Sequence, residues 1–258
     1  RKETLVGGYE RSALVRSKLR KPKVSLRRLQ QLVRWLNTLS SSSSDGSSKP
    51  LSVRTLHAEL RSGLVLCEVM RRLVPGTTYE ALHKRPRTRA TATRNLEEAL
   101  GVVWRSGRVN NSRIAKASEI YDGHPKETVT RTLNEIFHVY VAQDVRKRAP
   151  RILGWFDGLL TAKLPAAATA PPHLEVWDAF ADGKRLAEVL GYFFSVFQDR
   201  RRDDHDEASL LSRVFANLRD LDVPLYWTPQ EWSTFPDTDF VLVQLDAIYD
   251  RLRDCPAA

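Results

Sequence analysis

The chain has 258 residues, and its 42% of apolar residues is close to the average for folded globular proteins. It contains no run of the ~20 uninterrupted apolar residues that a membrane span requires, which argues against membrane insertion. The formal charge of +10 is unevenly distributed, because residues 1–150 hold 30 Lys and Arg against 13 Asp and Glu, whereas residues 151–258 hold 11 against 18. The first part therefore suits an acidic partner, and the second is mildly acidic.

Residues 1–23 show no hydrophobic periodicity, and we expect them to form an extended arm. Seven positive charges fall within 13 residues with no acid among them: Arg16, Lys18, Arg20, Lys21, Lys23, Arg27 and Arg28. Such a run repels itself unless a polyanion is nearby. We interpret it as a binding arm; the alternative is a solvated tail that only aids solubility.

Apolar residues at helical spacing follow the arm and predict four main helices in the first half. The first covers residues 24–39, and the serine-rich residues 40–50 should form a flexible loop. The second runs through Leu56 and Met70 and ends near Pro75-Gly76. Gly63 lies inside it and should let another helix approach closely. The third covers residues 96–103, and the fourth covers 129–140 after a turn at 122–125.

A basic loop precedes the third helix. Its cations are Lys84, Arg85, Arg87 and Arg89. They form either a second contact for the acidic partner or an ordinary exposed loop, and the sequence leaves both interpretations open.

The second half repeats the same hydrophobic plan. Trp35 and Trp155 are separated by the same interval as Gly63 and Gly183, and all four are expected to serve the structural core. Helical spacing recurs over residues 152–160, 186–197, 211–221 and 241–252, and no segment shows the sustained alternation of a β-strand. The sequence therefore predicts two all-α domains in tandem, at residues 24–145 and 149–255.

Sequence patterns for catalysis, nucleotide binding or zinc binding do not stand out. The acidic run at residues 203–207 has neither the ligand spacing nor the turn glycine of a calcium loop. Cys67 lies in an apolar run and is expected to be buried rather than disulfide-bonded. We expect a non-enzymatic protein without a cofactor or a metal.

Several segments, taken in their order along the chain, resemble the calponin homology family of helical modules. In the first half these are residues 35–37, 60–70, 94–100 and 120–123, and in the second Trp155 with residues 182–186, 215–218 and 235–240. The resemblance implies a divergent tandem pair, all-α and cytoskeletal. The chain departs from this pattern in three places. Ser62 stands where the family usually carries Asp, and Leu32 stands where actin-binding pairs tend to carry an aromatic residue. The connection between the two halves, residues 141–149, is also shorter than in actin-binding pairs.

The resemblance and the charge together imply a module that binds an acidic cytoskeletal filament. Because of these departures, tubulin is the preferred partner and actin the alternative, with the arm and the basic loop as the contact. We therefore expect the protein in the cytoplasm, on the cytoskeleton. A ciliary or flagellar axoneme, with other axonemal or scaffold proteins as partners, is one such location. Assembly between the basic and acidic halves is a further alternative. Nucleic-acid binding would also suit the charge, but the basic region lacks interleaved aromatic residues for base stacking.

Overall fold

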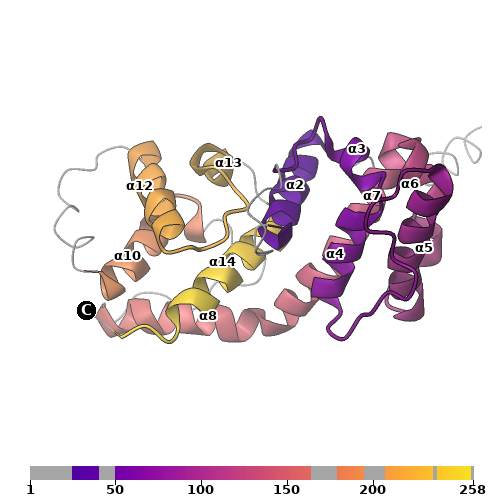
Figure 1. The fold of residues 1–258 in the computed structure, drawn as a ribbon. Coiled ribbons are helices and arrows are strands. Elements are labelled where there is room, and N and C mark those ends of the chain that lie inside the picture. The colour runs from indigo at the N-terminus through magenta and orange to yellow at the C-terminus, as the bar shows by residue number, and fades with distance from the viewer. Residues whose placement is uncertain (1–24, 41–49, 164–178, 195–206, 235–236, 257–258) are drawn as a thin grey trace, which may run out of the picture.

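The structure is a computed structural model that describes residues 25–40, 50–163, 179–194, 207–234 and 237–256. Every regular element in these ranges is a helix (Figure 1), so the predicted all-α class is confirmed. The first unit contains α2 (Leu26–Ser40), α3 (Leu56–Leu60), α4 (Leu64–Leu73), α5 (Arg89–Arg105), η1 (Asn111–Arg113), α6 (Ala117–Asp122) and α7 (Lys126–Phe137). The second contains α10 (Lys184–Phe193), α12 (Glu207–Asp220), α13 (Pro229–Thr234) and α14 (Thr238–Leu252), and η2 (His138–Ala142) and α8 (Gln143–Lys163) connect the two.

The predicted second helix is in fact two helices. α3 ends at Leu60, and Gly63 caps the start of α4 with a left-handed φ of 77°. The expected close approach at this glycine is present, because a Cβ there would lie 2.6 Å from the Cβ of Asn95 and 2.8 Å from the backbone nitrogen of Leu96 in α5. Glycine accepts both the positive φ and the crowding, since it has no side chain.

The internal repeat is visible in space as well as in sequence. In the first unit Trp35 meets Phe137 edge to face, with ring centroids 5.2 Å apart. In the second, Trp155 meets Tyr249 in the same way at 5.4 Å. Gly183 also repeats the role of Gly63, with a φ of 75° at the start of α10. Trp35 is only 2% exposed, whereas Trp155 is partly exposed on the edge of its core.

The connection between the units is helical throughout, which the sequence did not predict. α7, the π-helical η2 and α8 follow one another without a break from Lys126 to Lys163. α8 also contains Pro150, which lacks the N–H for one helical hydrogen bond. The last helix of the first unit therefore continues into the first helix of the second, and α14 lies beside α8 (Figure 1).

The boundaries 24–145 and 149–255 remain predictions, because the helix runs through the region between them. Most of the serine-rich loop and most of the acidic run 203–207 lie outside the described residues. In the part of the chain that the structure describes, none of the helices combines the length and the hydropathy needed to cross a membrane.

Candidate functional site

A groove on the first unit combines apolar and cationic side chains. It has a volume of about 570 Å³ and is formed where α2, the segment before α3, and the start of α7 meet. Leu26 is 64% exposed at its edge, Arg54 and Lys126 supply positive charge, and Glu127 supplies one negative charge. An exposed apolar residue within a charged rim is typical of a surface that contacts another protein.

His57 lies in the same groove with one ring nitrogen buried. Its Nδ1 has no hydrogen-bond partner in the structure. Burial lowers the pKa of His57 below its usual value, and the neighbouring Lys126 lowers it further. The imidazole is therefore neutral at pH 7, and the positive charge of the groove comes from Arg54 and Lys126.

The cationic surface continues from the groove along α3. Arg54 precedes this short helix, His57 lies within it, and Arg61 directly follows its last residue. The guanidinium of Arg61 lies 4.2 Å from the ring centroid of Tyr121, and that of Arg89 lies 5.1 Å from the same ring. Tyr121 thus brings together two cations that are distant in sequence.

The predicted basic loop joins this surface through Arg89. His83, the residue before the loop, is held by buried Asn95, whose Oδ1 accepts from the His83 nitrogen at 2.8 Å and whose Nδ2 donates to the His83 carbonyl at 3.0 Å. Thr88 caps α5, so both ends of the loop are fixed. Lys84, Arg85 and Arg87 are exposed and have no ion-pair partner among the described residues, whereas Arg89 pairs with Asp122 at 2.8 Å.

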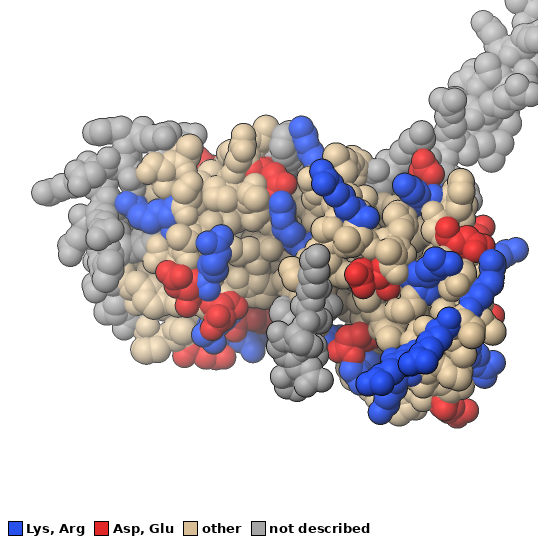
Figure 2. Space-filling view, turned by 45° about the horizontal axis from the view of Figure 1, so that its top comes forward, with Lys and Arg blue, Asp and Glu red and all other residues tan. Residues whose placement is uncertain are grey.

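We call this surface the basic face: Arg54, His57, Arg61, Lys84, Arg85, Arg87, Arg89 and Lys126, with Leu26 at its edge. Figure 2 shows many Lys and Arg side chains over the first unit. The sequence singled out only the loop, because Arg54, Arg61 and Lys126 are isolated along the chain. No sequence pattern connects Arg54 with Arg61, because the two residues lie outside α3, one on each side of it.

The start of α2 lines this groove through Leu26. Arg16, Lys18, Arg20, Lys21 and Lys23 lie outside the described residues. Arg27 is exposed at the start of α2. Arg27 therefore adds an exposed positive charge next to Leu26.

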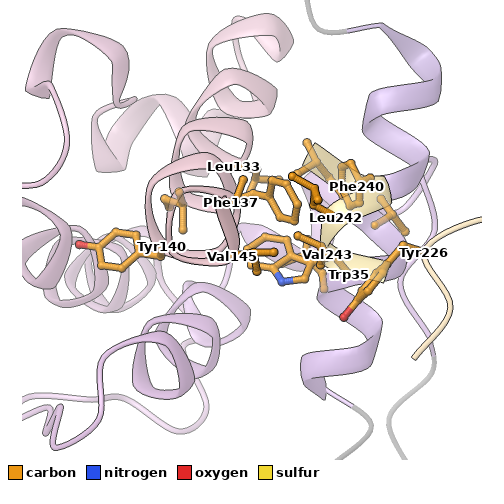
Figure 3. Packing of buried hydrophobic residues seen from close by; sticks show 14 of the residues in the cluster. Trp35, Leu133, Phe137, Tyr140, Val145, Tyr226, Phe240, Leu242 and Val243 are labelled. Carbon is orange, nitrogen blue, oxygen red and sulfur yellow. The ribbon is translucent and has the colours of Figure 1, made fainter. Parts of the chain in front are cut away.

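Arg28 has a different environment from its neighbours in the run, because its guanidinium lies between the two units. It is 14% exposed, donates to both carboxylate oxygens of Asp237 at 2.7 and 2.8 Å, and lies 4.5 Å from the ring centroid of Phe240. Phe240 in turn stacks on Phe137 at 4.2 Å (Figure 3). We therefore leave Arg28 out of the basic face and assign it to the packing of the units.

A second ion pair joins the units at the middle of α2. Arg34 donates to Glu231 at 2.5 Å and to the carbonyl of Tyr226 at 3.2 Å. Burial alone would raise the pKa of Glu231, but the hydrogen bonds from Arg34 and Thr228 outweigh it and leave the pKa lowered. α2 is therefore held against the second unit along much of its length.

Metal-binding chemistry finds no support in the described ranges, where His, Cys, Asp and Glu do not gather in groups of three that could hold an ion. Cys67 is buried, and its thiol donates to the carbonyl of Asn95 at 3.2 Å. Burial raises the pKa of Cys67 to about 12, so this thiol is a poor nucleophile.

Comparisons with known proteins point to one family. A model of the calponin homology (CH) domain matches residues 26–142. Among solved structures, the chain is similar to the actin-crosslinking core of fimbrin from Schizosaccharomyces pombe, with a TM-score of 0.62 and 17% sequence identity. The match covers 88% of this chain and 50% of that one, so this chain spans about half the length of the fimbrin core. At this identity the likeness concerns the fold. A comparison with curated proteins gave no match.

Proposed function

We propose that the chain is a non-enzymatic, cytoskeletal module that binds actin filaments, because residues 26–142 match the calponin homology domain and the fold is similar to that of a tandem pair of such domains. The contact is the basic face of the first unit together with the end of the arm. The module would act in the cytoplasm, on the cytoskeleton.

The observation that carries the proposal is the groove beside α2. Leu26 offers apolar area to a partner, while Arg54 and Lys126 offer charge to an acidic one. The centre of a protein interface is usually apolar and its rim polar, and charge at the rim mainly accelerates and orients association. The exposed cations of the loop extend the rim toward α5.

Actin replaces tubulin as the preferred filament. The sequence favoured microtubules and an axonemal location, but the comparisons lend neither any support. The similar structure is described as an actin-crosslinking core, and this favours what the sequence had as the alternative. The acidity of a filament does not separate the two, since charge attracts either polymer.

Two of the three departures that weighed against actin lie at a partly buried position, Ser62, and a buried one, Leu32. Ser62 accepts a hydrogen bond from the Leu64 nitrogen at 3.2 Å, as Asp182 does from the Lys184 nitrogen at 2.9 Å in the second unit. Leu32 is completely buried and so unavailable to a partner. A serine that accepts the same hydrogen bond as an aspartate, and an altered core residue, leave the outer surface unchanged.

Charge reversal at the groove tests the proposal. We expect the double substitution Arg54→Glu/Lys126→Glu to weaken co-sedimentation with filamentous actin about tenfold or more at 0.1 M salt, because several exposed charge contacts are lost together. The affinity of the native chain should fall as salt rises. Microtubules, measured in parallel across the same salt series, should bind less tightly than actin.

The matched control is Arg105→Glu/Arg219→Glu, which makes the same change in net charge. Arg105 lies at the far end of α5, about 24 Å along the helix from Arg89, and Arg219 lies on α12 of the second unit. The control should retain most of the actin affinity. If both variants lost actin affinity equally, the loss would be explained by net charge and not by the groove. If the native chain bound microtubules more tightly than actin, the choice of actin would be wrong.

A further inference from the structure

One threonine lies among the cations of the basic loop. Thr88 is exposed, and its backbone is extended, with a φ of −118° and a ψ of 159°. Residues 84–87 before it belong to neither a helix nor a strand, and the side chains of Lys84, Arg85 and Arg87 are exposed. The loop therefore presents a hydroxyl group at the end of an exposed, cationic and non-helical segment.

The spacing of the cations before Thr88 is that of a substrate for an arginine-directed protein kinase. Arg85 lies three residues before Thr88 and Lys84 four residues before it, so the acidic subsites of such a kinase can bind both side chains of an extended segment. Kinases select their substrates partly by charge patterns of this kind. Among the serines and threonines of the described ranges, Thr88 alone follows an arginine at this distance. The pattern thus singles out one hydroxyl group.

Pro86 favours the extended shape that a kinase cleft requires. A proline disfavours the helical conformation of the residue before it, here Arg85, and it has no N–H group to donate to a helix. The two hydrogen bonds between Asn95 and His83 hold the loop where it begins. The segment that leads to Thr88 is therefore kept out of α5 before any kinase binds.

Entry of the hydroxyl group into a kinase cleft requires only the first turn of α5 to open. Oγ1 of Thr88 accepts from the Thr91 nitrogen at 3.2 Å, and Arg89 pairs with Asp122 at the surface, where the two side chains are 59% and 43% exposed. An N-cap is typically worth about 1 kcal/mol and an exposed ion pair less. The first buried residue of α5 is Ala92, so this turn can open without disturbing the core.

The position also suits a phosphate once it is attached. A phosphothreonine carries about two negative charges and three strong acceptor oxygens, and an anion is favoured at the first turn of a helix. Lys84, Arg85 and Arg87 have no ion-pair partner among the described residues, so their charges are available to the phosphate. The phosphate would in turn offset about two of the three positive charges that these side chains offer to a filament.

We propose that Thr88 is a phosphorylation site for an arginine-directed serine/threonine kinase and that the phosphate weakens the contact of the basic face with its filament. In the reaction, Oγ1 of Thr88 forms a bond to the γ-phosphorus of ATP, the bond from that phosphorus to the bridging oxygen of ADP breaks, and a base of the kinase takes the hydroxyl proton. The effect on the filament rests on the function proposed above, whereas the site itself does not.

Phosphate incorporation tests the site on the full chain. The probe is activated calcium/calmodulin-dependent protein kinase II with Mg²⁺ and ATP, and mass spectrometry locates the phosphate. We expect Arg85→Gln to slow the phosphorylation of Thr88 about tenfold, because one charge-assisted contact with the kinase is lost. The matched control is Arg94→Gln, which removes an exposed cation of α5 beyond the segment that enters the kinase and should leave the rate unchanged.

Substitutions at Thr88 separate the phosphate from the helix cap. Thr88→Asn keeps an N-cap acceptor but takes no phosphate, whereas Thr88→Ser keeps both. After treatment with kinase and ATP, the native chain and Thr88→Ser should lose about tenfold in affinity for filamentous actin at 0.1 M salt, and Thr88→Asn should keep its affinity. Thr88→Asn retains every other acceptor, so it also controls for phosphate elsewhere on the chain.

Immobilised polyglutamate serves as a second acidic probe that does not depend on actin. The phosphorylated native chain should elute from it at lower salt than the treated Thr88→Asn variant, because the basic face has lost positive charge.

Two results would overturn the proposal. One is that phosphate is absent from Thr88, or is added to it equally fast in the native chain and in Arg85→Gln. The other is that the phosphorylated native chain binds actin and polyglutamate as tightly as the treated Thr88→Asn variant does. If the untreated native chain failed to bind actin, the proposed function would be wrong, and phosphate incorporation and the polyglutamate column would still decide the role of Thr88.

Discussion

Gly63 shows at the scale of one residue how the two halves of the chain keep a common fold. It combines a left-handed φ with close contact to α5, and Gly183 repeats the combination against Leu211 of α12. Sequence spacing alone indicated a close approach at Gly63. It did not indicate that the helix ends there, because a glycine within an apolar pattern is compatible with either outcome.

Replacing Gly63 should cost much more than replacing another glycine of similar φ. We expect Gly63→Ala to lower the free energy of unfolding by about 3 kcal/mol, because left-handed strain adds to a clash with backbone atoms of α5. Gly76 has a φ of 82°, but a Cβ added there would meet no atom within 4 Å, so Gly76→Ala should cost only about 1 kcal/mol. Urea unfolding compares the two, and equal losses would contradict the packing role of Gly63.

Asp246 makes a pH-dependent contribution to stability. Burial raises its folded pKa to about 6, above the ordinary value of 3.8, so the folded state binds more protons than the unfolded state between these pH values. The contribution of this group to stability therefore falls as pH rises from about 4 to 6 and stays unfavourable above. Asp246→Asn should remove a cost on the order of 2 kcal/mol at about pH 7.5 and change little at about pH 4.

Measuring unfolding of the native chain and of Asp246→Asn at both pH values checks this. The difference between the two proteins cancels the effects of other groups, such as Glu231, whose lowered pKa acts in the opposite direction. A variant that is equally or more destabilised at the higher pH than at the lower one would show that the ion pair with Arg148, 2.6 Å away, outweighs the burial of Asp246.

At the scale of elements, the errors of the sequence-based predictions fall where helices are short or continuous. The four long helices of the first unit and their counterparts have enough turns to show a period of 3.6 residues. α6 and α13 have six residues each, too few to show one, and both were missed. The joined helix from Lys126 to Lys163 was divided in two because polar residues and Pro150 interrupt its apolar pattern.

The joined helix also changes how the units are related. A loop between them would leave their relative orientation to surface contacts. A helix that belongs to both cores instead fixes the axis on which they are built, and α14 packs against its η2 and α8 segments. The π-helical η2 lies at the junction itself, and such segments often occur at functional positions in helices.

At the scale of the whole molecule, one arginine of the basic run is central to the packing of the units. Arg28 donates to Asn134 in the first unit and to Asp237 in the second, and its guanidinium lies near the rings of Phe137 and Phe240. The bidentate pair with Asp237 is specific to the planar guanidinium. The two units should therefore unfold together as long as this contact is intact.

Removing Arg28 should uncouple the units. We expect Arg28→Ala to lower the free energy of unfolding by about 2 kcal/mol and to broaden or split the transition, because the carboxylate of Asp237 loses its partner. Calorimetry and tryptophan fluorescence during urea unfolding detect both effects. Arg28→Lys should recover only part of the loss, and the exposed neighbour Arg27 provides the control Arg27→Ala. A single sharp transition of native stability would contradict this role.

The helical class, the tandem repeat and the resemblance to calponin homology domains could all be predicted from the amino-acid sequence, because helical spacing and repeated Trp and Gly positions are local properties of the chain. The basic loop and the arm were identified in the same way, by charge density. Folding in three dimensions was needed to bring Arg54, Arg61 and Lys126 to one surface and to withdraw Arg28 into the junction of the units. These groupings depend on how distant segments pack, and packing is decided by the shapes of both partners rather than by either segment alone.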